Sequence, residues 1–379
     1  MTANVGGFDP SKSSILMLHP MLMDSSWLAN QLDDPRLDDC YNLIAFDLRA
    51  CGKSKCGPSD AHDSWVNAAD LAFAHQALHL PACHIFAVET LSVTCALRFA
   101  ILFPDLCLSL TLCNVPPPTD LGWVYNSYEE LLLLWSFAED LESFELAGTE
   151  AATLVLGNNY DPEILDQLME FWALHTRPAL RLRTVEMFNV FMNRTPLNKE
   201  ELAQIRHPVL IIQSEQSPVA PVKYAEELAA ELHDAHLFIV KGVSGPSTVL
   251  PSSASIVNRV FSQFLAHMPP SNSTITAPTI PVALRMKSAL TKLGSLAGNT
   301  AIAARDPRLS SSFSRISEEV RENQAECLTV YEQDLDKAFS PLNYNGKPYR
   351  RYIDRHKDHW FHPDRDGMSF ISGEFLSFP

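Results

Sequence analysis

The chain has 379 residues, of which 46% are hydrophobic, and its 45 acidic and 29 basic residues give a formal net charge of −16. This length and apolar content suffice for a large folded core, and no apolar run approaches the roughly 20 residues that a membrane span requires. The excess negative charge repels phosphate groups, so nucleic acid and anionic membrane surfaces are poor candidate partners.

The N-terminus and the cysteines both indicate a cytoplasmic protein. Residues 1–14 lack the charged start and apolar core of a signal peptide. The eight cysteines form no CxxC pair and fall mainly within predicted strands and helices, so we expect reduced thiols that pack as small hydrophobic side chains.

Apolar runs and helical periodicity alternate along the first third of the chain. Short apolar runs bounded by turn residues predict buried strands, and apolar residues at helical spacing predict the helices between them. The predicted elements in chain order are strands at 14–18 and 41–46, a helix at 65–80, a strand at 84–88, a helix at 92–102 and a strand at 108–113. This alternation predicts an α/β fold with a parallel sheet and helices on both faces.

Four motifs in order resemble the α/β-hydrolase superfamily. His19-Pro20 is similar to the family's HG, and residues 47–54 (DLRACGKS) are similar to DxRGxGxS. Residues 208–218 (PVLIIQSEQSP) are similar to PVLxxxGxxDxxxP, and residues 256–265 to the closing helix. The resemblance covers about residues 10–270 and implies an α/β-hydrolase fold: a mostly parallel sheet, helices on both faces and a helical lid insertion. Residues 99–118 and the C-terminal region are similar to hydrolase-like proteins of filamentous fungi.

The resemblance and the composition together divide the chain into four regions. The core is expected at 1–117 and 206–268, the helical lid at 118–205, a linker at 269–282, and a C-terminal extension, partly helical and partly disordered, at 283–379. We expect three lid helices, at 128–146, 162–175 and 179–192, whose apolar residues pack as core or line a pocket for a small apolar ligand.

The family's nucleophilic serine is missing from this chain. Aligning the helix after the nucleophile places Thr90 in the nucleophile slot, Val88 and Ser92 at the two flanking glycines, and Leu91 at the residue whose backbone N–H serves the oxyanion hole. Because side chains replace both glycines, we expect a relaxed turn that presents Thr90 poorly.

A register shifted by one residue remains as an alternative. It puts Glu89 at the turn, flanked by Ala87, which is similar to the carboxylate nucleophiles of dehalogenase relatives. This register disturbs the helix match, so Thr90 is the preferred assignment.

The acid and base slots are substituted as well. Ser217 stands in the acid slot, with Glu215 as the only nearby carboxylate, and Ser247 stands in the base slot. No histidine occurs between His236 and His267, and His236 comes too early in the chain to serve as base.

The resemblance implies that the remaining oxyanion donor is the backbone N–H of Met21. His19 corresponds to the family's oxyanion-loop histidine, which is structural, and Pro20 replaces a flexible glycine.

Loss of a whole triad costs on the order of a million-fold in turnover. We therefore expect a non-hydrolytic protein that binds a small apolar ligand under the lid or another protein, without a cofactor. The alternative is a divergent hydrolase or a lyase-like enzyme that acts on a small apolar substrate of the secondary-metabolite type.

The C-terminal extension is expected to be attached to a finished body and to dock a protein partner. Residues 268–281 are rich in Pro, Ser and Thr, which is typical of a flexible linker. A helix is predicted from Ser317, with Glu318 and Glu319 in its first turn. His356, His359 and His362 lie close together but have no cysteine partner, so we expect no metal site there.

Overall fold

The computed structural model describes residues 2–3, 7–157 and 161–355, and within them seven strands form one sheet. The sheet order is β1-β3-β2-β4-β5-β6-β7; β1 is antiparallel to β3, and all other neighbours are parallel. The strands are β1 (Thr2–Ala3), β2 (Ser14–Leu18), β3 (Asn42–Phe46), β4 (Cys83–Val88), β5 (Cys107–Cys113), β6 (Val209–Ser214) and β7 (Ala235–Val240). The predicted parallel sheet is confirmed.

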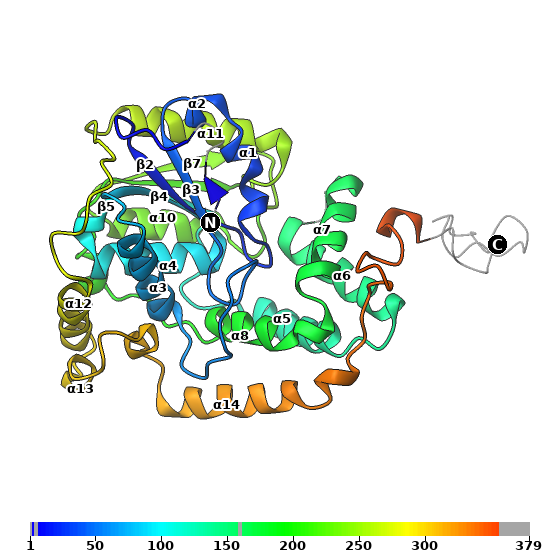
Figure 1. Cartoon of the computed structure of the whole chain (residues 1–379). Coiled ribbons are helices and arrows are strands. Elements are labelled where there is room, and N and C mark those ends of the chain that lie inside the picture. Colours follow the sequence, from blue (N-terminus) through cyan, green and yellow to red (C-terminus); the bar gives the residue numbers. More distant parts are fainter. Residues whose placement is uncertain (1, 4–6, 158–160, 356–379) are drawn as a thin grey trace, which may run out of the picture.

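Helices cover both faces of this sheet (Figure 1). Because side chains alternate along a strand, Ile85 of β4 joins the core beneath α3 and α4, while its neighbour Phe86 packs against Phe261 of α11 on the other face. The helices of the sheet domain are α1 (Ala29–Leu32), α2 (Pro35–Asp38), α3 (Ser64–Ala77), α4 (Glu89–Leu102), α10 (Val222–Glu231) and α11 (Pro251–Ala266).

The helical insertion between β5 and β6 contains five helices: α5 (Gly122–Ser136), α6 (Leu141–Leu156), α7 (Pro162–His175), α8 (Arg181–Met192) and α9 (Lys199–Leu202). The single helix predicted at 128–146 is wrong, because the chain forms α5 and α6 there. The Asp140 carboxylate accepts a hydrogen bond from the Ser143 backbone N–H, and the Ser143 hydroxyl accepts one from the Asp140 backbone N–H. This capping box starts a new helix inside an otherwise continuous apolar pattern.

Part of the segment expected to be a flexible linker is held against the start of β2. The Ser13 hydroxyl donates to the Ser271 carbonyl at 2.8 Å, and the Ser14 and Ser273 hydroxyls are 2.7 Å apart. Ser273 is 1% exposed. The polar side chains that suggested flexibility are therefore used to attach this segment to the body.

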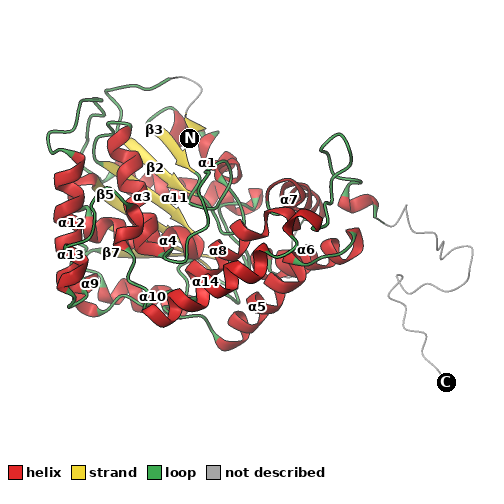
Figure 2. Ribbon diagram, turned by 60° about the horizontal axis from the view of Figure 1, so that its bottom comes forward, coloured by secondary structure: helices red, strands yellow, loops and turns green. Residues whose placement is uncertain are grey.

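The C-terminal extension packs along the body and the lid (Figures 1 and 2). Its helices are α12 (Val282–Leu296), α13 (Thr300–Ala303) and α14 (Glu318–Glu332). Leu290 and Leu293 of α12 and Phe313 are fully buried, α12 contacts α3 and α4, and α14 runs along α8. The extension thus completes the hydrophobic core, in contrast to the expected attachment to a finished body.

Two further features concern the whole described chain. No helix in the described ranges combines the length and apolar character needed to cross a membrane. All eight cysteines lie within these ranges and are free thiols, five of them buried.

Two leucines of α12 offer a test of the packing of the extension. Leu290 is fully buried and Leu284 is 63% exposed. Leu290→Ala should lower the free energy of unfolding by about 2–5 kcal/mol, because it leaves a cavity in the core, whereas Leu284→Ala should change it by less than about 0.5 kcal/mol. Chemical denaturation measures both, and equal effects of the two variants would contradict the docked arrangement.

Candidate functional site

The turn that joins β4 to α4, residues 88–90, is called the elbow below. Glu89, the first residue of α4, has φ 62°. A left-handed backbone is strained for a residue other than glycine, and most strained for a β-branched one. The strained conformation thus falls on Glu89, one residue before Thr90, and the turn is not relaxed. This geometry matches the register in which Ala87, and not Val88, occupies the first flanking position.

The Glu89 carboxylate meets the backbone of the loop that follows β2. The Met21 N–H donates to Oε2 of Glu89 at 3.1 Å. Some of the Glu89 side chain still reaches the surface, but protein atoms surround the carboxylate, and this burial raises its pKa to about 7, against the opposing effect of the Met21 bond. In the part of the chain that the structure describes, no cation lies within ion-pair distance of Glu89.

Buried hydrogen bonds hold the Met21 loop in place. His19 Nε2 accepts the Leu48 N–H at 3.1 Å, and the Ser92 hydroxyl donates to the His19 carbonyl at 2.5 Å. Burial lowers the pKa of His19, in agreement with a neutral ring. His19 therefore has the structural role that was expected, and Ser92, placed by the sequence at a flanking glycine, instead ties α4 to this loop.

The lid closes over the elbow almost completely. The cavity at Glu89 and Thr90 has a volume of about 20 Å³, and Val124 and Tyr128 of α5 and Val155 of α6 form part of its wall. Pockets for small molecules measure roughly 300–1,000 Å³, whereas a single water needs about 10–15 Å³. In this closed form the elbow has room for one water and for no substrate.

The acid-slot residue lies at this small cavity. Ser217 lines it and accepts the Ala220 N–H at 3.2 Å. Glu215 is bound elsewhere, because Lys241 Nζ and the Gly242 N–H contact its carboxylate at 2.7 and 2.9 Å. The structure therefore brings Ser217, and not Glu215, toward the elbow.

The base-slot residue lies in a loop that the lid covers. Ser247 is fully buried, does not line the elbow cavity, and its hydroxyl has no hydrogen-bond partner among the described residues. Gly245 packs so closely against the carbonyl of Leu156 that a Cβ there would lie 2.5 Å from the oxygen. His236 is 74% exposed beside Asp234. None of these residues supplies a base to the elbow.

The other sequence assignments at the site have mixed outcomes. Met21 contacts the elbow, as expected of the oxyanion donor. Leu91 lies one residue deeper in α4 than the residue that follows Glu89, so in the register of the structure the second donor would be the N–H of Thr90.

Within the described ranges, no group of three potential metal ligands occurs. His356, His359 and His362 lie outside those ranges.

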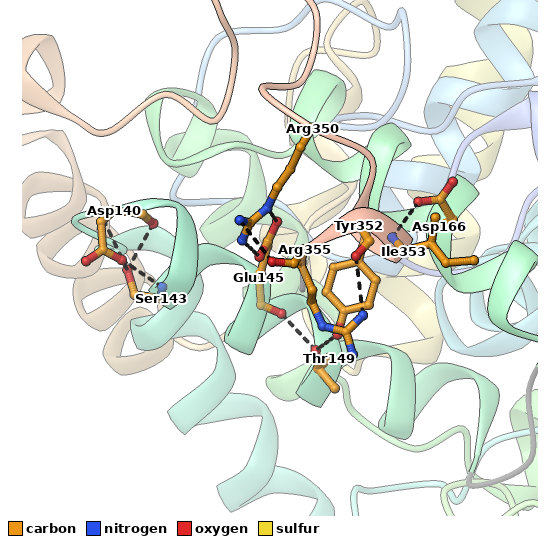
Figure 3. A network of polar contacts seen from close by, with 9 residues as sticks. All are labelled: Asp140, Ser143, Glu145, Thr149, Asp166, Arg350, Tyr352, Ile353 and Arg355. Atoms are coloured by element: carbon orange, nitrogen blue, oxygen red, sulfur yellow. Dashed lines mark hydrogen bonds and ion pairs between the residues drawn. The ribbon is translucent and has the colours of Figure 1, made fainter. Parts of the chain in front are cut away.

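The C-terminal extension holds two lid helices together (Figure 3). Arg350 makes a bidentate ion pair with Glu145 of α6, at 2.9 and 2.5 Å, and the hydroxyl of Tyr352 lies 2.7 Å from that of Thr149 on the same helix. Asp166 of α7 accepts the backbone N–H of Ile353 at 3.0 Å. Since α6 carries part of the wall of the elbow cavity, this contact stabilises the closed lid.

Comparisons with known proteins agree with the fold of the sheet domain. Residues 190–274 match the α/β-hydrolase family model described as TAP-like protein. No curated protein sequence matches the chain. Similar solved structures include a hydrolase from Oleispira antarctica (TM-score 0.58, 18% identity, covering 70% of this chain and 94% of that one). Others are an enol-lactonase from Burkholderia xenovorans (0.57, 16%, 70% and 95%) and an esterase from Exiguobacterium antarcticum (0.57, 14%, 68% and 93%). At these identities the likeness establishes the α/β-hydrolase fold.

The ion pair between the extension and α6 can be tested by hydrogen exchange. Arg350→Ala removes both bonds to the Glu145 carboxylate and should destabilise the lid by about 1.5–3 kcal/mol, so that the amides of α6 exchange roughly ten times faster or more. Tyr344→Ala, at a residue of the extension that is 97% exposed, is the matched control. Unchanged protection of α6 in Arg350→Ala would show that the extension does not hold the lid.

The raised pKa of Glu89 predicts a particular dependence of stability on pH. Between about pH 4.5 and 7 the unfolded state has lost the Glu89 proton and the folded state retains it, so this group destabilises the fold progressively as the pH rises. Glu89→Gln lacks the effect and should gain about 2 kcal/mol relative to wild type between pH 4.5 and pH 8, less than the full linkage value because the side chain keeps some contact with water.

Urea denaturation at several pH values measures this gain. Glu130→Gln, at an exposed position of α5, is the control and should follow the wild-type curve. A constant difference between wild type and Glu89→Gln at all pH values would contradict the burial of the carboxylate.

Proposed function

We propose that this chain, which has the α/β-hydrolase fold, is a non-hydrolytic binding protein whose elbow is filled by its own carboxylate. In the oxyanion hole of a hydrolase, backbone N–H groups stabilise the negative oxygen that forms on the substrate. Here the Met21 N–H already donates to Glu89. That contact carries the proposal, because a substrate carbonyl would have to displace a carboxyl group that is part of the protein.

The residues around the elbow give independent support. Ser217 and Ser247 replace the acid and the base, and neither residue type can take a proton from a nucleophile at neutral pH. The cavity of about 20 Å³ leaves no room for an ester. The buried apolar residues of the extension, on α12, at Phe313 and on α14, pack against the body or the lid, so we place the binding function in a cavity and not on the extension.

A second candidate is proton-transfer chemistry at Glu89, of the lyase-like kind. A general acid or base works best when its pKa is near the operating pH, and burial raises the pKa of Glu89 to about 7. A carboxylate at this turn could also act as a nucleophile. Both roles require the lid to open, since the closed cavity admits one water.

Esterase assays separate these functions. Protein incubated with p-nitrophenyl acetate and p-nitrophenyl butyrate should release p-nitrophenol no faster than Thr90→Ala or Glu89→Gln, and a fluorophosphonate probe should label none of the three. The reason is that Ser217 and Ser247 stand in place of the acid and the base that activate the nucleophile of the family.

The same assays identify the residue responsible if the expectation fails. A burst of product equal to the protein concentration, lost in Thr90→Ala, would overturn the proposal and restore Thr90 as nucleophile. A burst lost in Glu89→Gln and retained in Thr90→Ala would establish the second candidate with Glu89 as a carboxylate nucleophile.

A further inference from the structure

A second, larger cavity lies between α4 and α10. Its volume is about 350 Å³ and it shares no lining residue with the elbow cavity. The walls are mostly apolar and include the loop of residues 115–118, with its three consecutive prolines, the segment 194–197, and Leu97 and Leu228. This volume falls in the range of small-molecule sites, which the elbow cavity does not reach.

Arg98 of α4 lines this cavity and is buried without a carboxylate partner. Its side chain is 2% exposed, and no described carboxylate lies within ion-pair distance of it. Nη1 donates to the Thr94 carbonyl at 3.2 Å and Nη2 to the Thr195 carbonyl at 2.6 Å, while Nε has no acceptor. Arginine is almost never fully buried unless it is paired, yet the carboxylates of Asp63 and Glu201 act on Arg98 only through space.

The carboxylates that act on Arg98 through space are bonded to another arginine. Asp63 accepts the backbone N–H of Arg315 at 2.7 Å, and Glu201 forms an ion pair with the Arg315 guanidinium. Burial lowers the pKa of Arg98 to about 10, which still leaves the group charged at neutral pH. Its face stacks on the ring of Trp65, 5.1 Å from the centroid, a contact that orients the cation without neutralising it.

A second arginine in the wall, Arg194, is paired with a carboxylate, whereas Arg98 is not. Arg194 is equally buried, but Asp120 binds both of its terminal nitrogens, at 2.7 and 2.8 Å. The Nε of Arg194 also lacks an acceptor. The cavity wall therefore contains one guanidinium, that of Arg98, to which no carboxylate is directly bonded. The Nε–H groups of Arg98 and Arg194 have no acceptor, and the rest of the wall is largely apolar.

We propose that this cavity binds an apolar monocarboxylate, with the carboxylate at Arg98 and the apolar part against the prolines and leucines. A guanidinium has five N–H donors, and only two of those of Arg98 are bonded, so donors remain for a carboxylate. Glu227 and Glu231, both exposed, also line the cavity. Their charge disfavours a phosphate or a dicarboxylate, whereas a single negative charge compensates Arg98 alone.

The proposed ligand site does not depend on catalysis at the elbow, because the two cavities have no lining residue in common, although Asp120 of the elbow cavity binds Arg194 in the wall of the other. An apolar ligand was expected under the lid. The proposed ligand is an apolar monocarboxylate, and its site lies outside the lid cavity.

Isothermal titration calorimetry with octanoate tests the proposal, and 1-octanol is the uncharged control ligand. Octanoate should bind with one site per chain, and 1-octanol should bind about tenfold more weakly or worse, because its hydroxyl forms no ion pair with the guanidinium. Arg98→Met should remove the preference for the carboxylate. Equal affinity for the two ligands, or no binding of octanoate at all, would overturn the proposal.

A variant that fills the cavity, with a matched control on the same helix, tests the proposal if Arg98→Met does not fold. Leu228→Trp places a ring in the cavity and should abolish octanoate binding, whereas Ala230→Trp, at an exposed position of the same helix, should leave it unchanged. Glu89→Gln should also bind octanoate as wild type does. Octanoate binding that survives Leu228→Trp, or that is lost in Glu89→Gln, would place the ligand elsewhere and contradict this assignment.

Discussion

The hydrogen bond from the Met21 backbone to Glu89 connects the parts of this protein that a hydrolase would use for catalysis. It joins the loop after β2 to the first residue of α4, and it puts a carboxylate where a substrate oxygen would lie. The carboxylate is largely removed from water, and burial raises its pKa to about 7. Because the Met21 N–H donates to Glu89, it needs no water or substrate oxygen as acceptor. The lid can therefore cover the elbow without leaving this N–H unsatisfied.

The lid is closed by contacts from outside the sheet domain. Residues 350–353 bind α6 and α7, α14 runs along α8, and α12 covers α3 and α4. Two of these segments, residues 350–353 and α14, thus restrain the insertion, and the third packs on the sheet domain. The cavity above the elbow holds one water, while a separate, ligand-sized cavity lies beside α4 at Arg98. A binding role away from the elbow fits this arrangement better than turnover at the elbow.

The left-handed residue of the elbow lies one position before the residue that the sequence favoured, for an identifiable reason. The helix pattern of residues 96–100 tolerates a shift of one position, since an apolar stripe on a helix is broad. The choice between Glu89 and Thr90 depends on where β4 ends against its neighbours β2 and β5, which fixes the residue that must turn left-handed. The useful signal was chemical: Glu89 is the one titratable side chain between β4 and the buried part of α4, and it has an alanine two residues before it.

By itself the sequence determined the order of strands and helices and the parallel sheet, because alternating apolar patterns are local properties. Only the tertiary structure decided that Glu89 accepts the Met21 N–H, that the segment around Ser273 attaches to β2, and that Arg98 is buried without a carboxylate. These features depend on which distant residue arrives as a partner. Composition predicted a flexible linker and a separate extension, but the apolar face of α12 is buried against α3 and α4, and no local pattern specifies that partner.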